Sequence, residues 1–400
     1  MMQILDAQKE ERVPPLFRLA FRPLFLLGGL FSCLALLLWG ATLNGMMQFA
    51  PYGNVLFWHS HEMLFGFVSA IIVGFLLTAV QNWTGIPSIR GVKLGILTGL
   101  WLLARVLMLF SNCPVWLIIP IDLLFLPLSG YWLAKPIIAI GQMRNLFFVP
   151  ILVLLSAMNL VMHLGVALDM PSLYQHGFLS AIWLITLLMC VLGGRVIPFF
   201  TANGTRTPKV EPLPWLEYAA LGSTWGLFAL FVTGAVYYLP SVFIGSLLIL
   251  CAVTHAWRAF RWHFQRTLSV PLLWSLHAAY WFIPIGIFLM GLSYLTTAIS
   301  LSTAFHTLTV GAMGNMILSM MSRVSLGHTG RQLAVKQLVI VAFIAVLISA
   351  LLRVFGTLLF QEHSFTLILV SIIAWCMAYG IFTLVYFPVL TQPRVDGRPG

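Results

Sequence analysis

The sequence is poor in charged residues. Asp, Glu, Lys and Arg make up only 8% of its 400 residues, whereas a soluble domain carries about 25%. Hydrophobic residues make up 60% of the chain, and the mean hydropathy is +1.00. Water could not solvate the surface that such a chain would leave exposed. The composition therefore excludes a soluble globular enzyme and predicts an integral membrane protein.

Cysteine and the common catalytic motifs are scarce or absent. The 5 cysteines contain no C-x-x-C pair, so neither a disulfide framework nor a cysteine metal site is indicated. No Walker loop, GxSxG, HExxH or dinucleotide-binding motif occurs, so ATP-driven transport and the common hydrolase chemistries lack support. No A-x-A cleavage site follows the first apolar run, and we expect that run to be retained.

Long apolar runs are abundant. A membrane span needs about 20 mostly apolar residues, and the runs show no period-2 alternation, so we expect helices rather than barrel strands. The predicted fold is an all-α polytopic bundle of about twelve transmembrane helices in a single domain, 19–390, between terminal segments 1–18 and 391–400. The predicted spans are 19–40, 56–80, 93–111, 115–134, 147–167, 176–199, 214–235, 239–257, 273–295, 301–321, 335–357 and 365–388.

Lysine and arginine predict the orientation of these spans. Of the 21 basic residues, all but Arg105 and Arg353 fall in segments that the alternation of spans puts on one side, together with both termini. Because positively charged loops stay in the cytoplasm, we expect both termini to be cytoplasmic. The net charge of +11 is then a topology signal. Nucleic-acid binding is not needed to explain it.

Two charges of opposite sign lie inside neighbouring predicted spans. Arg105 and Asp122 are eight and nine residues from the short turn at Cys113, which is about 12–14 Å along a helix. Equal depth on adjacent antiparallel helices predicts a buried ion pair. Such a pair either joins two helices or lines a proton or ion pathway, and both interpretations stay open.

Histidines are concentrated toward the predicted outer face. Imidazole is a common ligand of haem iron and of copper, and helix bundles build such sites from facing helices. We therefore expect metal ligands among these histidines, with Glu62 beside them; the alternative is that the imidazoles bond loop carbonyls. The five histidines at this depth are His59, His61, His163, His176 and His306.

Helical geometry gives finer expectations for two of these spans. On an α-helix His59 and Glu62 share a face, while His61 points to nearly the opposite side. Gly311 and Gly314 follow His306, so we expect either room for a flat macrocycle beside an axial His306 or close helix packing through small residues.

Two glycine-bearing span ends at the predicted inner face carry an arginine each. Arg195 and Arg323 could bind an anion such as a haem propionate. The alternative is ordinary termination of a span by a positively charged residue, as cytoplasmic loops require.

Five stretches of the chain carry a family resemblance. They are FRPLFLLGGL at 21–30, WHSHEMLFGF at 58–67, GFLLTAVQNWTG at 74–85, GGRVIPFFTANGT at 193–205 and HTLTVGAMGNMILSMMSRVSLGHTGR at 306–331. With them, the sequence resembles nearly end to end the NnrS family of bacterial membrane proteins associated with the response to nitric oxide. The resemblance implies a twelve-helix, haem- and copper-containing protein of the inner membrane, linked to denitrification or nitrosative stress.

These observations together predict a haem-binding protein, with copper as a second candidate cofactor, that takes part in the response to nitric oxide. His59, His61 and His306 are the expected ligands, and His163 and His176 are expected to ligate or hydrogen-bond beside them. Nitric oxide is a candidate ligand because it binds ferrous haem and copper. Turnover would need an external electron donor, since no soluble redox domain is present, and whether the protein is an enzyme stays open.

Two functions from other classes remain. A transporter of a small solute or metal would suit twelve spans with a buried Arg105–Asp122 pair, but it should converge its polar groups at mid-membrane rather than near one face. An assembly partner of another membrane complex would need a large lateral surface, which the sequence does not reveal. The respiratory haem-copper oxidase pattern, with an adjacent His-His pair and H-x-x-x-Y, is absent.

Overall fold

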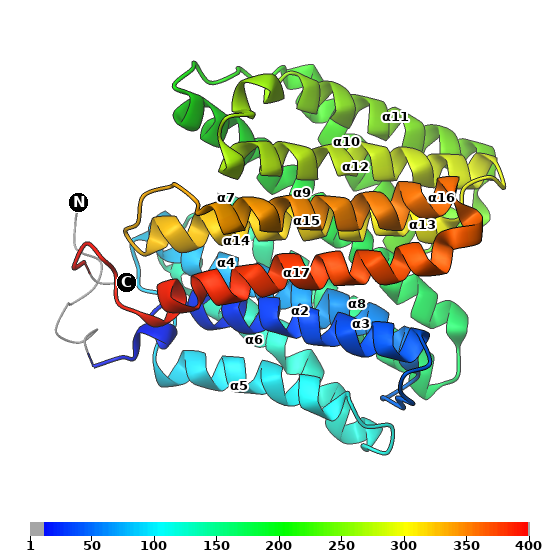
Figure 1. The fold of residues 1–400 in the computed structure, drawn as a ribbon, viewed down its shortest axis with the longest axis horizontal. Helices are drawn as coiled ribbons and strands as arrows, with labels where there is room; N and C mark the ends of the chain where they lie inside the picture. Colours follow the sequence, from blue (N-terminus) through cyan, green and yellow to red (C-terminus); the bar gives the residue numbers. More distant parts are fainter. Residues whose placement is uncertain (1–11, 399–400) are drawn as a thin grey trace. The chain divides into compact units, whose positions relative to one another are not determined.

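The computed structural model describes residues 12–398, and every regular element in this range is helical (Figure 1). The all-α prediction is thus confirmed for this part of the chain. The predicted terminal segments fall partly outside the described residues, at 1–11 and 399–400.

Each predicted span coincides with one helix or with consecutive helical pieces. Within residues 12–398, nine segments are long and apolar enough to cross a membrane, which supports a multi-pass membrane protein. They are Phe21–Leu43 (α2), Val55–Thr84, Val115–Ala139 (α6), Met143–Ala167, Pro171–Thr205 (α9), Ser241–Phe260 (α11), Pro271–Leu295 (α12), Gln337–Leu359 and Gln361–Thr391. The other three predicted spans are also helical, and the total of twelve stays a prediction. They form α5 (Val92–Leu107), α10 (Pro214–Val232) and the pieces between Leu301 and His328.

Several spans consist of pieces that differ in helix type. The composite spans contain α3 (Val55–His61), η2 (Glu62–Val68), α4 (Ser69–Thr84), α7 (Met143–Leu146), α8 (Phe148–Ala167), α13 (Leu301–His306), η5 (Thr307–Gly314), α14 (Asn315–His328), α15 (Gln337–Leu351), η6 (Leu352–Gly356), α16 (Thr357–Leu359), η7 (Gln361–His363) and α17 (Ser364–Thr391). Short 3-10 turns form η1 (Pro15–Phe17), η3 (Ala235–Tyr238) and η4 (Phe264–Thr267).

Three of these pieces are π-helices, which are rare and often occur at functional sites. They are η2, η5 and η6. The first begins directly after His61 and the second directly after His306, while η6 contains Arg353. The two family stretches that contain histidines therefore both change from α-helix to π-helix directly after a histidine, which is His61 in one and His306 in the other.

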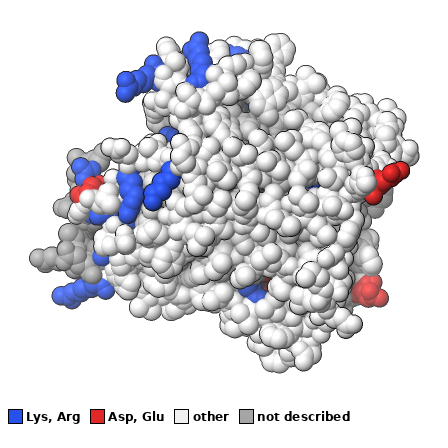
Figure 2. All heavy atoms as spheres, in the orientation of Figure 1, with Lys and Arg blue, Asp and Glu red and all other residues white. Residues whose placement is uncertain are grey.

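The visible surface is largely uncharged. On the face drawn in Figure 2, Lys, Arg, Asp and Glu occupy only a few places among uncharged residues. Large apolar side chains are exposed along the helices, among them Ile96, Val242 and Leu384. Contact with lipid accounts for such a surface, which would be a liability in water.

The chain divides into two compact units. Unit 1 comprises the described residues within Met1–Phe178, together with Met321–Leu333 and the described residues within Tyr379–Gly400. Unit 2 comprises Leu179–Met320 and Ala334–Ala378. Helices α9, α14 and α17 each continue from one unit into the other.

Small residues allow close packing of helices inside each unit. In unit 1, a Cβ atom on Gly28 of α2 would lie 2.9 Å from a methyl group of Ile71 in α4. In unit 2, a Cβ atom on Gly245 or Gly291 would lie 3.0 Å from the carbonyl oxygen of the other glycine, so α11 and α12 approach through their backbones. Such small-residue contacts are typical of helix packing in membranes.

One end of unit 1 brings several of the chain's basic segments together. The Gly91 amide, in the loop between α4 and α5, donates to the Phe17 carbonyl over 2.8 Å. The guanidinium of Arg22 donates to the Leu390 carbonyl over 3.0 Å. The segment before α2 thereby contacts the α4–α5 loop, and the first turn of α2 contacts the end of α17.

Candidate metal centre

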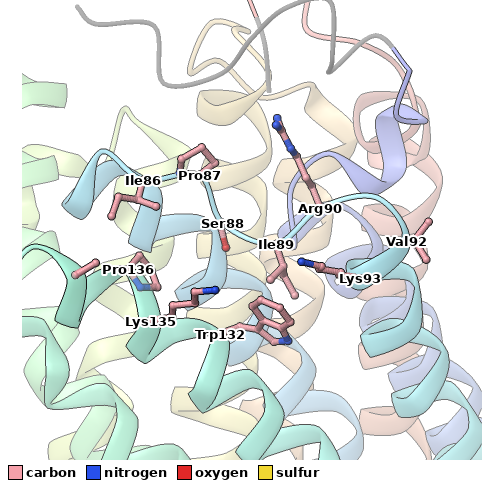
Figure 3. Close-up of a pocket in the computed structure, with 11 residues that line it drawn as sticks. Ile86, Pro87, Ser88, Ile89, Arg90, Val92, Lys93, Trp132, Lys135 and Pro136 are labelled. Atoms are coloured by element: carbon pink, nitrogen blue, oxygen red, sulfur yellow. The ribbon is translucent and has the colours of Figure 1, made fainter.

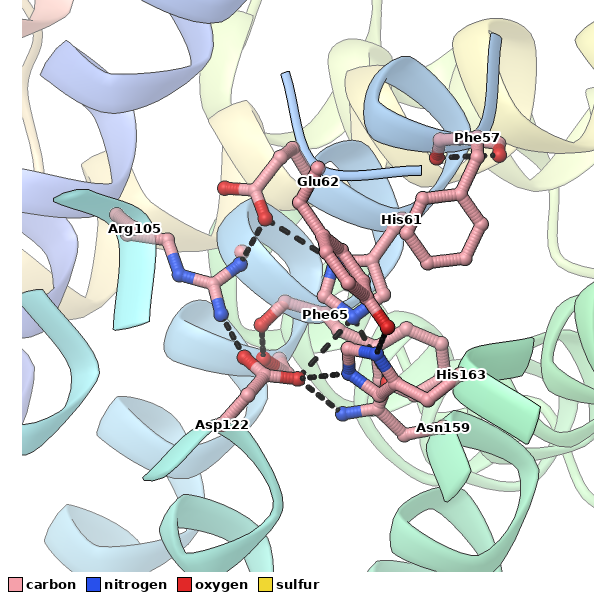
Figure 4. Close-up of polar contacts among 12 residues, drawn as sticks. Phe57, His61, Glu62, Phe65, Arg105, Asp122, Asn159 and His163 are labelled. Carbon is pink, nitrogen blue, oxygen red and sulfur yellow. Dashed lines mark hydrogen bonds and ion pairs between the residues drawn. The ribbon is translucent and has the colours of Figure 1, made fainter. Parts of the chain in front are cut away.

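A group of metal-ligand atoms lies buried inside unit 1. His61 ends α3, Asp122 lies in α6 and His163 lies in α8, and one donor atom of each lies within 4.8 Å of the other two (Figure 4). Nε2 of His61 is 3.1 Å from Oδ2 of Asp122, and Nε2 of His163 is 3.2 Å from the same oxygen. The two histidines are 0% exposed and Asp122 is 4% exposed.

In each imidazole, Nδ1 is the ring nitrogen that faces away from Asp122, and it contacts an oxygen that can accept its proton. Nδ1 of His61 is 3.0 Å from Oε1 of Glu62, and Nδ1 of His163 is 3.4 Å from the hydroxyl of Tyr52. If each Nδ1 carries the proton and donates, both Nε2 lone pairs point toward Asp122. Metal-binding histidines are commonly oriented in this way by carboxylate or other oxygen partners.

Tyr52 lies in the loop before α3, outside the predicted spans. Burial, together with the nearby negative charge of Asp122, raises the pKa of Tyr52 to about 12. Its hydroxyl is therefore protonated at neutral pH. A neutral hydroxyl can accept the Nδ1 proton of His163 without adding charge to the cluster.

Arg105 of α5 neutralises part of the negative charge. Its Nη1 donates to Oε1 of Glu62 over 2.5 Å, and its Nη2 donates to Oδ1 of Asp122. The predicted Arg105–Asp122 ion pair is therefore confirmed. Because Arg105 binds Oδ1, the other oxygen of Asp122 remains directed toward the histidines.

Asn159 contacts both Asp122 and His61. It precedes His163 by four residues on α8, so both side chains lie on one face of that helix. Its Nδ2 donates to Oδ2 of Asp122 over 2.6 Å, and its Oδ1 lies 2.8 Å from Nε2 of His61. The amide thus offers a further oxygen beside the three converging atoms.

Two imidazoles and a carboxylate form a donor set that suits a transition metal. Ligand atoms about 2.0–2.1 Å from a tetrahedral metal are about 3.3 Å apart, and the observed separations from Asp122 Oδ2 are 3.1 and 3.2 Å. Nitrogen and oxygen donors of this kind bind copper(II), iron(II) or zinc. These two separations fit a single metal ion, and the two Nε2 atoms lie within 4.8 Å of each other.

The charges inside the cluster do not cancel while the histidines are neutral. Arg105 contributes one positive charge, and Glu62 and Asp122 contribute two negative charges. Buried charge is costly unless it is compensated. A bound cation would compensate it, and so would a proton on His61, whose two ring nitrogens both face carboxylates.

The first turn of η2 explains how His61 and Glu62 meet. The predicted separation of His61 from Glu62 is wrong, because the imidazole and the carboxylate are in hydrogen-bonding contact where α3 gives way to the wider π-helix. His61 and His59 do contact different helices, as their spacing predicts. Gly66 keeps this place open: a Cβ atom there would lie 2.9 Å from Nη1 of Arg105 and 3.1 Å from Oε2 of Glu62. Regular helix periodicity could not predict this arrangement.

Two other predicted ligands of unit 1 lie outside this donor group. The ring of His59 stacks on the ring of Trp39, with centroids 4.4 Å apart and an angle of 10° between the planes. His176 is half-buried near the start of α9. Within residues 12–398, the group of converging donor atoms contains neither histidine.

His306 belongs to unit 2 and pairs with the second intramembrane arginine. Its Nδ1 lies 2.7 Å from the carbonyl oxygen of Ser302 and 3.0 Å from Nη2 of Arg353. Of the two expectations for the glycines that follow His306, close helix packing is the one that the structure shows. A Cβ atom on Gly311 or Gly314 would collide with the ring of Phe282 or Trp375 respectively, so these glycines serve helix packing.

The two predicted anion-binding arginines belong to different units. Arg195 lies exposed on α9 in unit 2, and Arg323 lies half-buried on α14 in unit 1. Neither belongs to the donor group around Asp122.

Three members of the cluster had no predicted role as ligands or supports. Asp122 was expected only to pair with Arg105, and Asn159 and Tyr52 were not singled out. The spacing of Asn159 and His163 within one apolar run was a usable signal, because polar side chains in a span usually face the bundle interior. Tyr52 lies in a loop, where no periodicity indicates its direction.

Comparison with known proteins identifies the family. A family model described as NnrS protein matches residues 15–394, a range that includes the whole buried cluster. No curated protein that was compared with the chain matches it. The chain belongs to the NnrS family.

Proposed function

We propose that this protein binds one copper ion between His61, Asp122 and His163 and acts in the response to nitric oxide. The observation that carries the proposal is the convergence of two Nε2 atoms on one carboxylate oxygen inside the membrane part of unit 1. Family membership supports the context of nitric oxide. The choice of copper rests on the resemblance, which implies haem and copper, and on the suitability of this donor set.

The surrounding residues have distinct parts in this proposal. Glu62 and Tyr52 would hold the two imidazoles by their Nδ1 protons, and Arg105 would balance the carboxylates. A bound copper ion would supply an open position at which nitric oxide can bind. A redox reaction at this site would depend on an electron donor such as a quinol or a cytochrome.

The same cluster does not fit a haem. The ring of His61 is 0% exposed, both its nitrogens have partners, and the rings of Phe57 and Phe65 lie 5.4 and 5.3 Å from it. A porphyrin would have to displace these side chains. Haem binding therefore remains a proposal from the family resemblance, with His59, His176 and His306 as candidate ligands and Arg195 and Arg323 as candidate partners of its propionates.

A second function is favoured by the position of His61 between two carboxylates. A protonated, positively charged His61 would balance the charge of the cluster without a metal ion. In addition, Oε2 of Glu62 is buried without a hydrogen-bond partner among residues 12–398. Such a group could exchange a proton, as in a proton-coupled transporter of a small solute. The expected separation between outer histidines and a deeper ion pair does not hold, because His61, His163, Arg105 and Asp122 form one cluster.

Copper binding and its response to nitric oxide can be tested on detergent-purified protein. We expect copper near one equivalent per chain and an electron paramagnetic resonance spectrum that changes when nitric oxide is added without oxygen. The His163→Gln variant should lose both properties. A matched His255→Gln variant, altered in unit 2, should retain them. A folded wild-type protein that takes up no copper would favour the proton-coupled alternative, which proton uptake into vesicles would then test.

A further inference from the structure

A pocket of about 580 Å³ opens at the basic end of unit 1 (Figure 3). It lies where α4 ends, α5 begins and the last turns of α6 pass beside them. The lining includes three basic residues and no acidic one. The basic residues are Arg90, Lys93 and Lys135.

The pocket lining combines polar and apolar side chains. Nζ of Lys93 lies 5.1 Å from the centre of the Trp132 ring, which holds the ammonium group over the aromatic face. Oγ of Ser88 is buried without a hydrogen-bond partner among the described residues, so it is available to a ligand. Ile86 and Ile89 supply apolar lining, and Ile89 is 6% exposed.

The position of Lys93 also favours an anion. It occupies the first turn of α5, where the helix dipole makes a cation unfavourable, and α5 has no side-chain cap for its first amide groups. A negative ligand would offset both effects. The pocket therefore places Lys93 and Lys135 together in a lining that contains no acidic residue.

We propose that this pocket binds the headgroup of an anionic phospholipid. Two of the helices that border it, α4 and α6, end there as candidate membrane spans, so the pocket lies at headgroup depth. Basic pockets between transmembrane helices bind such headgroups, and the basic side of this protein is the predicted cytoplasmic side. A phosphate group would contact Lys93 and Lys135 while the acyl chains follow the apolar lining. Free phosphate would leave that lining unused.

The proposal can be tested by titrating delipidated protein with phosphatidylglycerol and counting bound lipids by native mass spectrometry. We expect one tight site per chain that prefers phosphatidylglycerol to phosphatidylcholine. Two lysines near a membrane surface correspond to about a 30-fold difference in affinity, so Lys93→Gln/Lys135→Gln should weaken binding by about that factor.

A matched variant controls for the loss of two positive charges. Lys209 and Lys336 are exposed residues of unit 2 that do not line the pocket, and Lys209→Gln/Lys336→Gln should bind as the wild type does. Equal binding by the two double variants would overturn the proposal. So would inorganic phosphate that competes at the concentration of the lipid, since the site would then be one for free phosphate. If Lys93→Gln/Lys135→Gln does not fold, Lys135→Gln alone should show about a fivefold loss.

Discussion

Each unit contains a buried polar network in which an arginine meets a carboxylate, and these two networks differ in what their histidines face. In unit 2, Arg258 forms a two-pronged ion pair with Glu217, with contacts of 2.8 and 2.5 Å. His255 contacts the hydroxyls of Tyr280, at 2.9 Å, and Thr224, at 2.7 Å. In unit 1 the histidines face a carboxylate instead. A buried histidine near an arginine is therefore not enough to indicate a metal site.

The balance of charge separates the networks further. Arg258 and Glu217 cancel each other, and the Glu217 side chain is 28% exposed. Arg105 faces two carboxylates that are almost fully buried. In unit 2 the charges are therefore balanced within the network, which links helices α10 and α11. The cluster of unit 1 has one more negative than positive charge while its histidines are neutral. A metal ion or a proton would supply positive charge there.

The largest contrast is expected in metal content. Replacing His61 or His163 by Gln should abolish copper binding, because each change removes one of three ligands. His255→Gln should leave the metal content unchanged. Metal analysis of the three purified variants, each checked for an unaltered helical circular dichroism spectrum, makes the comparison. Equal copper content in all three variants would contradict the assignment of the metal site to unit 1.

The next largest contrast is expected in the stability of the metal-free protein. Arg105→Met leaves two buried carboxylates without their partner, which should cost about 3–5 kcal/mol. Arg258→Met should cost less, since Glu217 can reach solvent. Thermal unfolding of both variants in the same detergent measures the difference. A larger loss for Arg258→Met would mean that the unit 1 carboxylates are protonated in the absence of metal.

A smaller effect is expected at the residue that orients His61. Glu62→Gln keeps the side-chain shape but weakens the acceptor of the Nδ1 proton, and loss of such a partner typically lowers metal affinity 10–100-fold. Glu217→Gln in unit 2 serves as the matched control and should not change the affinity. Competition with a copper chelator gives both dissociation constants. An unchanged affinity in Glu62→Gln would remove the carboxylate from the proposed support of the metal.

The smallest effect is expected at a surface ion pair of unit 1. Its contribution to stability gives a lower limit for the contributions of the buried ion pairs. Hydrogen bonding by Arg394 lowers the pKa of Asp396 to about 2, whereas an unfolded chain has a value of about 3.9. The pair therefore stabilises the fold above about pH 4, and this contribution is lost as the pH falls toward 2.

Because this pair is exposed, it should contribute less than about 1 kcal/mol. Unfolding midpoints between pH 2 and 7 for the wild type and Asp396→Asn should differ most above about pH 4 and converge as the pH falls toward 2. A loss at pH 7 as large as that of Arg105→Met would contradict the ranking of buried over exposed pairs.

Sequence patterns predicted the helices and part of the cluster, for physical reasons that can be stated. Hydrophobic length and composition mark nine segments of residues 12–398 as candidate spans, and equal distance from a turn was enough to pair Arg105 with Asp122. The contact between His61 and Glu62 was not predictable from a 3.6-residue period, because η2 changes the period at that point. The pairing of His306 with Arg353 depends on α13 packing against η6, which is distant in the sequence, and no local pattern reveals it.

X-ray absorption at the copper edge of the purified, copper-loaded protein tests the central claim most directly. The account predicts nitrogen and oxygen neighbours at about 2.0 Å with the outer-shell scattering of two imidazoles, and no sulfur. Asp122→Asn should perturb this spectrum or lose the metal. Sulfur at about 2.3 Å would contradict the account and point to a thiolate site, for which the buried Cys190 and Cys251 of unit 2 would be the first residues to examine.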